Sequence, residues 1–175
     1  MKNIPALDPK VLDLVTEISK EPKVEAAMAF IKDQTEVAMQ EQIELCEIEA
    51  PTFHEEKRAA SVAERMKLYG LTDVHIDEIG NVIGIRKGTG NGPVLAIGAH
   101  MDSVFPAGTD VKVKKEGNIY RAPGIGDNCS GLRALLQVLR AMEKEEHSYG
   151  RRYLVCRYGR RRGQRRYSRL KASLY

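Results

Sequence analysis

Apolar residues recur at helical spacing in the first third of the chain and predict two helices. Residues 23–48 carry such a pattern without Gly or Pro, and Pro51 closes the segment. The four residues from Thr52 to Glu55 predict a capping box, in which the hydroxyl and the carboxylate each accept from a free backbone N–H of a helix start. The second helix ends at Gly70, and its apolar face consists of Ala59, Val62, Ala63 and Met66.

The pattern then changes to strands. Residues 74–76 and 82–86 flank Gly80-Asn81, a pair typical of a hairpin turn. Residues 93–99 are almost all apolar, which predicts a central strand buried on both faces. Residues 110–120 predict a second hairpin that turns at 116–118.

A glycine-rich loop at 124–131 precedes the last predicted helix. That helix carries one apolar stripe, formed by Leu132, Leu135, Leu136, Leu139 and Met142. The order of helices and strands predicts the α/β class, as a sandwich of helices on a mixed sheet.

The composition is typical of a soluble globular protein, with 42% hydrophobic and 30% charged residues. No run approaches the roughly 20 apolar residues that a membrane span requires, and the first 20 residues have no apolar signal core. The three cysteines, Cys46, Cys129 and Cys156, are scattered and without CxxC spacing. We therefore expect a reduced cytoplasmic protein without a disulfide framework.

The net charge of +4 combines two different compositions. Residues 151–175 contain nine Arg, one Lys and no acidic residue. The rest of the chain therefore carries 18 of the 28 basic side chains against all 24 acidic ones. We expect two regions, a body at 1–148 and a basic, disordered tail at 149–175.

Two residues that could serve a metal site follow the predicted buried strand. His100 stands at its carboxyl end, where open α/β sheets place their sites, and Asp102 comes two residues later. In an extended chain both side chains point the same way. The Asp102 carboxylate can then accept the second ring N–H of His100 and fix its tautomer as a metal ligand.

Asp127 is the third candidate, set among the glycines of the 124–131 loop. Its carboxylate has two oxygens and can bridge two zinc ions held roughly 3.5–4 Å apart. Spacing alone leaves a second interpretation open, because Asp-Asn-Cys-Ser before an apolar helix is also a typical N-cap. A phosphate loop is disfavoured, because the glycine spacing differs from GxGxxG and Asp127 would repel a phosphate.

Three stretches together resemble a known family. The residues Gly98-Ala-His100-Met-Asp102 and Gly124-Ile-Gly-Asp127-Asn128, with the segment 48–55 before them, resemble the zinc-dependent exopeptidases and deacylases that include peptidase T, aminoacylase and succinyl-diaminopimelate desuccinylase. The match runs from about residue 42 to residue 142. It implies that the body is the N-terminal part of a mixed α/β/α zinc-peptidase sandwich, incomplete as it stands.

The resemblance also implies roles. His100 would ligate one zinc, Asp102 would orient His100 in a catalytic role, and Asp127 would bridge two zinc ions. The family then requires a Glu-Glu pair in a G-E-E-G motif, a later Asp, a dimerisation domain and a final His. None of these has a counterpart here, since Glu145-Glu146 lacks flanking glycines and is interpreted as a solvated helix end.

The basic tail has two interpretations. An Arg-rich segment binds phosphate with steep salt dependence, so the chain could be a small nucleic-acid-binding protein. Alternatively, residues 149–174, back-translated with suitable codons and read one base over, give TDGDILFVGTVGEEGRGDIRGLKHLF. That string contains the missing motif, and we favour a change of reading frame near residues 147–149 followed by premature termination.

The predicted parent function is hydrolysis of an amide bond in a small peptide or N-acyl amino acid by a water bridged between two zinc ions. For the chain itself we expect little or no activity, and an exposed apolar sheet edge. Nucleic acid is the less favoured partner, and a remnant that binds one metal or none is a third possibility.

Overall fold

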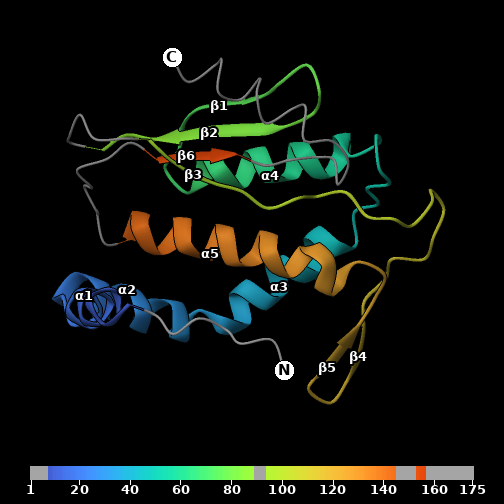
Figure 1. The fold of residues 1–175 in the computed structure, drawn as a ribbon. Helices are drawn as coiled ribbons and strands as arrows, with labels where there is room; N and C mark the ends of the chain where they lie inside the picture. Colours follow the sequence, from blue (N-terminus) through green and yellow to red (C-terminus); the bar gives the residue numbers. More distant parts are fainter. Residues whose placement is uncertain (1–7, 89–93, 145–152, 157–175) are drawn as a thin grey trace.

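The computed structural model describes residues 8–88, 94–144 and 153–156, and the account that follows concerns these residues. A four-stranded sheet lies above a layer of helices, and a separate two-stranded hairpin extends from one end (Figure 1). The helices are α1 (Pro9–Ser19), α2 (Pro22–Asp33), α3 (Thr35–Cys46), α4 (Glu56–Leu68) and α5 (Ser130–Lys144). The strands are β1 (Thr72–Ile76), β2 (Val82–Arg86), β3 (Leu95–Ile97), β4 (Lys114–Glu116), β5 (Ile119–Arg121) and β6 (Tyr153–Cys156). The predicted α/β class is confirmed.

The single helix predicted over residues 23–48 is wrong. The structure has two helices there, α2 and α3, which meet at Gln34, and α1 precedes them. A straight helix of that length would reach about 39 Å, whereas the 15-residue α5 is about 22 Å long at 1.5 Å per residue. The break lets both helices pack on α5, and Arg140 of α5 donates to the Gln34 side chain at 2.9 Å.

The hydrophobic core lies between the sheet and α3, α4 and α5. The predicted apolar faces of α4 and α5 are confirmed, because each residue assigned to these two faces is buried. Val82 of β2 and Met101, both without exposed surface, join this cluster from the sheet side. Burying these side chains is the main stabilising contribution, at about 25 cal/mol per Å² of apolar surface.

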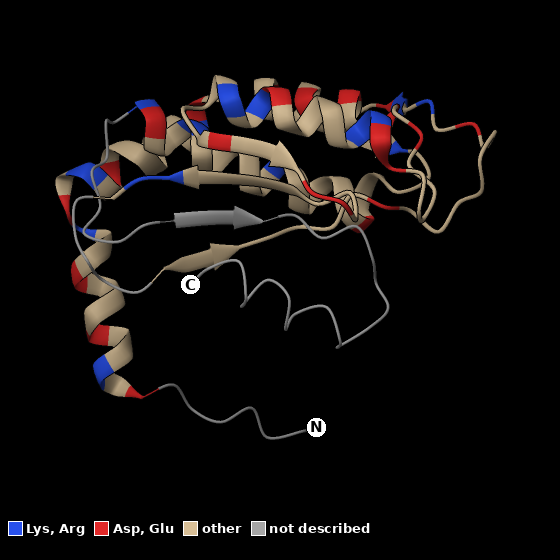
Figure 2. Cartoon of the chain, turned by 90° about the horizontal axis from the view of Figure 1, so that it is seen from above, with Lys and Arg blue, Asp and Glu red and all other residues tan. Residues whose placement is uncertain are grey.

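The order of strands in the main sheet is β1-β2-β6-β3. The predicted hairpin is confirmed, since β1 pairs antiparallel with β2 and Gly80 turns between them with a φ of 85°. β6 pairs antiparallel with β2 and parallel with β3. In Figure 2 these four strands lie side by side in that order. The second hairpin is also confirmed, with β4 and β5 turning at Gly117.

Two expectations about the strands need correction. The segment 93–99 was expected to be a strand buried on both faces, but β3 is the outer strand of the described sheet and all three of its side chains are exposed. Its apolar sequence therefore produces the exposed edge that the sequence predicts. Residues 153–156, expected to be part of a disordered tail, form β6 between β2 and β3. Glu145-Glu146 and residues 157–175 lie outside the described residues.

The capping box is the fourth correction. α4 begins at Glu56, and its N-cap residue Glu55 makes no side-chain capping bond. The Glu55 carboxylate instead accepts from the N–H of Phe53 at 3.0 Å. Thr52 lies too early to cap α4, and its hydroxyl contacts the segment that carries Asp102.

Candidate metal centre

The structure brings together the three residues that the sequence predicts for a metal site. His100 and Asp102 follow β3, and Asp127 lies in the turn η1 (Ile125–Cys129) before α5, where its own backbone is not helical, with a φ of −115° and a ψ of 93°. The His100 Nδ1 lies 3.2 Å from Asp102 Oδ1, and its Nε2 lies 3.0 Å from Asp127 Oδ1. The imidazole therefore stands between two carboxylates that are 25 residues apart in the sequence.

The two carboxylates differ in their surroundings. Asp102 is buried, with 3% of its side chain exposed, while 60% of the Asp127 side chain is exposed. A buried carboxylate is stable only when its oxygens are hydrogen-bonded, and Asp102 has His100 on one oxygen and Thr52 on the other. Asp102 is therefore suited to orienting His100, and Asp127 is suited to meeting an ion or a ligand from solvent.

Backbone contacts fix the segment that carries His100 and Asp102. Arg58 of α4, only 2% exposed, donates to the Met101 carbonyl between them and to the Ile48 carbonyl. The Ser103 N–H donates to the Ala50 carbonyl at 2.8 Å. Among the described residues no salt bridge joins Arg58 to a carboxylate, so carbonyl oxygens supply its hydrogen bonds. A buried arginine is costly to desolvate, and its guanidinium donors have a rigid geometry. Arg58 therefore fixes the positions of the carbonyls to which it donates.

The loop that carries Asp127 is attached at both ends. Asn128 Nδ2 donates to the His100 carbonyl at 3.1 Å, and Gln42 Nε2 of α3 donates to the Ile125 carbonyl at 2.7 Å. Gly131 lies in the first turn of α5 and close to the Asn128 side chain. A Cβ added at Gly131 would lie 2.1 Å from Asn128 Oδ1. At Gly126, by contrast, an added Cβ would meet no atom within 4 Å. The loop is thus packed on the inner side and open beside Asp127.

Two buried thiols lie beneath this loop. Cys46 and Cys129 are free cysteines without exposed surface, and the Cys46 thiol donates to the Pro123 carbonyl at 3.5 Å. The neighbouring Cys129 thiol and burial raise the pKa of Cys46 far above its usual range, so it stays protonated and neutral. These observations agree with the predicted absence of a disulfide framework for these two cysteines.

His100 and Asp127 have the chemistry and spacing of two ligands of one metal ion. Imidazole nitrogen and carboxylate oxygen are both zinc ligands, and at bond lengths of about 2.1 Å two ligands of a tetrahedral ion lie about 3.4 Å apart. The observed 3.0 Å between His100 Nε2 and Asp127 Oδ1 is close to this value. Among the described residues, however, no group of three or more His, Cys, Asp or Glu side chains is placed to hold a metal. The described residues therefore fit part of a metal site.

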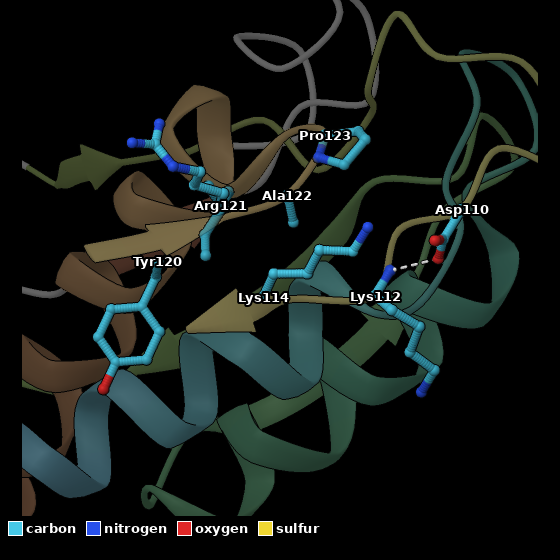
Figure 3. Close-up of a pocket in the computed structure, with 8 residues that line it drawn as sticks. Asp110, Lys112, Lys114, Tyr120, Arg121, Ala122 and Pro123 are labelled. Atoms are coloured by element: carbon cyan, nitrogen blue, oxygen red, sulfur yellow. Dashed lines mark hydrogen bonds between the residues drawn. The ribbon is translucent and has the colours of Figure 1, made fainter. Parts of the chain in front are cut away.

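A cavity of about 510 Å³ lies beside the β4–β5 hairpin, on the segment that leads to Asp127 (Figure 3). Its charged lining residues are Asp110, Lys112, Lys114 and Arg121, so its net charge is positive. Lys112 makes an ion pair with Glu47 of the loop after α3 at 2.8 Å, and the Val113 N–H donates to the same carboxylate. These donors hold the pKa of Glu47 below its usual value. They also attach the hairpin to the rest of the fold.

Three residues of this arrangement were not identified as functional from the sequence. Arg58 and Asn128 look like ordinary surface or capping residues in the sequence, and only the fold shows that they hold the Met101 and His100 carbonyls. The sequence predicts Thr52 as part of a capping box. Its position in the segment 48–55, which resembles the family, is the signal in the sequence that indicates a role at the site.

Comparisons with known proteins find peptidases and hydrolases. Residues 81–156 match the profile of peptidase family M28. The chain is 39% identical over 93 residues to a protein of Pyrococcus abyssi named putative [LysW]-lysine/[LysW]-ornithine hydrolase, a match that covers 53% of this chain and 26% of that protein. The chain thus spans about a quarter of the length of this curated relative.

Solved structures share the fold. A tripeptidase from Staphylococcus aureus superposes with a TM-score of 0.57 at 25% identity, covering 69% of this chain and 35% of that one. A protein of Bacillus subtilis described as a dinuclear metal binding peptidase from the M20 family superposes with a TM-score of 0.55 at 14% identity, covering 71% and 35%. In sequence and in fold the chain therefore resembles peptidases and hydrolases, as its motifs predict. In the part of the chain that the structure describes, no helix is both long enough and apolar enough to span a membrane.

Proposed function

We propose that this chain carries the first half of a two-zinc centre that hydrolyses amide bonds in small peptides or N-acyl amino acids. The observation that carries the proposal is His100 standing between two carboxylates, with Asp102 on Nδ1 and Asp127 on Nε2. The relatives support the reaction class, since one is named a hydrolase of lysine and ornithine conjugates and the others are named peptidases.

The residues have distinct roles in this proposal. His100 and Asp127 would hold the metal, and Asp127 is the candidate for a shared ligand because 60% of its side chain is exposed. Asp102 acts through His100, since an accepted Nδ1–H leaves the Nε2 lone pair for the metal. When bound, the zinc ions supply Lewis acidity and lower the pKa of water.

The 175-residue chain alone is proposed to have little or no hydrolytic activity. Only two candidate ligands converge here, because the described residues contain no group of three or more His, Cys, Asp or Glu side chains that could hold a metal. The family resemblance would further require a Glu-Glu pair, a further Asp and a further His. The relatives are named as hydrolases or peptidases, which gives no support to the nucleic-acid-binding alternative.

We further propose that the reading frame changes near residues 147–149. The family match extends past this point to Cys156, and the apolar run Tyr153–Cys156 occupies the β6 position in the sheet. The alternative frame places the similarly apolar ILFV there, so a strand at this position is compatible with both frames. The nucleotide sequence beyond the codon for Met142 decides the matter. If its other frames encode no G-E-E-G motif, the frame change is excluded.

Zinc titration against a competing chelator tests the metal centre. We expect the chain to bind Zn²⁺ weakly, and Asp127→Asn to weaken binding at least about tenfold, because a neutral amide replaces a ligand carboxylate. Asp13→Asn, an exposed position on α1, is the matched control and should leave the affinity unchanged. Equal affinities for wild type and Asp127→Asn would contradict the site. Hydrolysis of a dipeptide by the purified, zinc-loaded chain would contradict the proposed inactivity.

A further inference from the structure

The two oxygens of the buried Asp102 carboxylate have different partners. Oδ2 accepts from the Thr52 hydroxyl at 3.0 Å, and Oδ1 faces His100 Nδ1 at 3.2 Å. Because only 3% of this side chain is exposed, solvent offers little substitute for either partner. The orientation of the carboxylate plane therefore depends on both contacts.

The Thr52 hydroxyl has one proton and two acceptors within reach. Asp102 Oδ2 lies at 3.0 Å and the Ser103 carbonyl at 3.4 Å. A hydrogen bond to an ionised acceptor is shorter and roughly twice as strong as one between neutral groups. Both the shorter distance and the stronger acceptor indicate that the Thr52 hydroxyl donates its hydrogen bond to Asp102 Oδ2.

The backbone holds Thr52 in place for this contact. Pro51 and Ser103 form an isolated parallel bridge, and the Ser103 N–H donates to the Ala50 carbonyl. The two segments thus run side by side, which brings the Thr52 hydroxyl within hydrogen-bond distance of Asp102. This pairing gives the hydroxyl a fixed position before any ligand binds.

We propose that Thr52 is a positioning residue of the metal centre, which holds Asp102 so that its free oxygen accepts the Nδ1–H of His100. The inference rests on the metal role proposed for His100, and it deepens that role. Without the Thr52 hydroxyl, the buried Asp102 carboxylate loses the hydrogen bond to Oδ2 and rotates toward another donor. The His100 ring then loses the acceptor that fixes its orientation and tautomer.

Three variants test this inference in the full chain. Thr52→Val removes the hydroxyl and keeps the shape, and Thr52→Ser keeps the hydroxyl. Thr72→Val is the matched control, because Thr72 also donates a hydroxyl proton, to the Ile85 carbonyl at 3.1 Å, far along the sequence from the site. Two quantities are measured for each: Zn²⁺ affinity by chelator competition, and the NMR signal of the His100 Nδ1–H proton in the metal-free chain.

We expect Thr52→Val to bind Zn²⁺ about tenfold more weakly, the low end of the range for residues behind a metal ligand. The Nδ1–H signal should broaden or be lost through exchange with water, and Thr52→Ser should restore both quantities. An unchanged signal in Thr52→Val overturns the inference, as does an equal loss of affinity in Thr72→Val. If no variant and no wild type binds Zn²⁺, the proposed function fails, while the proton signal still decides the role of Thr52.

Discussion

Arg58 and Met101 are joined by a hydrogen bond from the Nη1 of the guanidinium to the backbone carbonyl, although they lie 43 residues apart. Met101 separates His100 from Asp102, so this bond links α4 directly to the candidate site. The same side chain also holds the Ile48 and Cys46 carbonyls, which ties the end of α3 to both. One buried arginine thus connects three segments of the chain.

Arg58→Met should destabilise the fold by at least about 3 kcal/mol, because it leaves several buried carbonyls without a donor, each at about 1–3 kcal/mol. Urea unfolding at neutral pH measures the change. Arg121→Met is the control, since Arg121 is exposed and makes only a long ion pair with Glu116 at 3.5 Å. A loss below about 1 kcal/mol in Arg58→Met would show that the three carbonyls do not depend on it.

Gly131→Ala should disturb the loop that carries Asp127. The new Cβ would overlap Asn128 Oδ1, which lies 2.1 Å from its position, and push Asn128 away from the His100 carbonyl. We expect weaker Zn²⁺ binding even though Ala favours a helix by about 1 kcal/mol over Gly. Gly126→Ala, with no atom within 4 Å of its Cβ, is the matched variant. Similar zinc affinities for the two variants would contradict the prediction.

Leu136→Ala should cost about 2–5 kcal/mol in the free energy of unfolding, as expected for a large cavity in a packed core. Leu136 has no exposed surface, whereas Val138 on the same helix is 40% exposed. Val138→Ala should therefore cost much less. Thermal or urea unfolding of both variants checks the ranking, which would be reversed if the outer side of α5 were the packed one.

Acid should weaken the attachment of the β4–β5 hairpin. Lys112 and the Val113 N–H hold the pKa of Glu47 below its usual value. A lowered pKa contributes stability at pH values above the unfolded-state pKa of about 4.3, and the contribution is lost as pH falls through the folded-state pKa. Wild type should therefore lose more stability between pH 5 and pH 3 than Glu47→Gln.

Urea midpoints at these two pH values measure the Glu47 effect. Glu64→Gln, an exposed position on α4, should lose stability as wild type does. A Glu47→Gln chain with the same pH dependence as wild type would show that this carboxylate does not hold the hairpin.

The sequence predicts those elements whose signals are local. The apolar faces of α4 and α5 and the two hairpins follow from spacing and turn residues, and the structure has them. The break at Gln34 has no Gly or Pro to mark it, and the contact of Gln34 with Arg140 joins residues that are 106 positions apart. β3 resembles a central strand because its residues are apolar, yet burial depends on which elements cover it.

The site divides in the same way. His100, Asp102 and Asp127 could be predicted as site residues because their motifs resemble those of a known family, and the structure places their side chains within hydrogen-bond distance. Thr52 and Arg58 could not be assigned, because their contacts join segments more than 40 residues apart. No local pattern shows which carbonyl or carboxylate a distant donor meets.

The position of β6 has a consequence for folding during synthesis. β2 and β3 have no direct pairing in the described sheet, and each meets the other only through residues 153–156. While these residues are still inside the ribosome, β1 and β2 can pair, but β3 has no strand partner in the described sheet. The β3 strand therefore joins the sheet only after residues 153–156 emerge, whereas the segment with His100 and Asp102 is also held by Arg58 and Ala50, which are made much earlier.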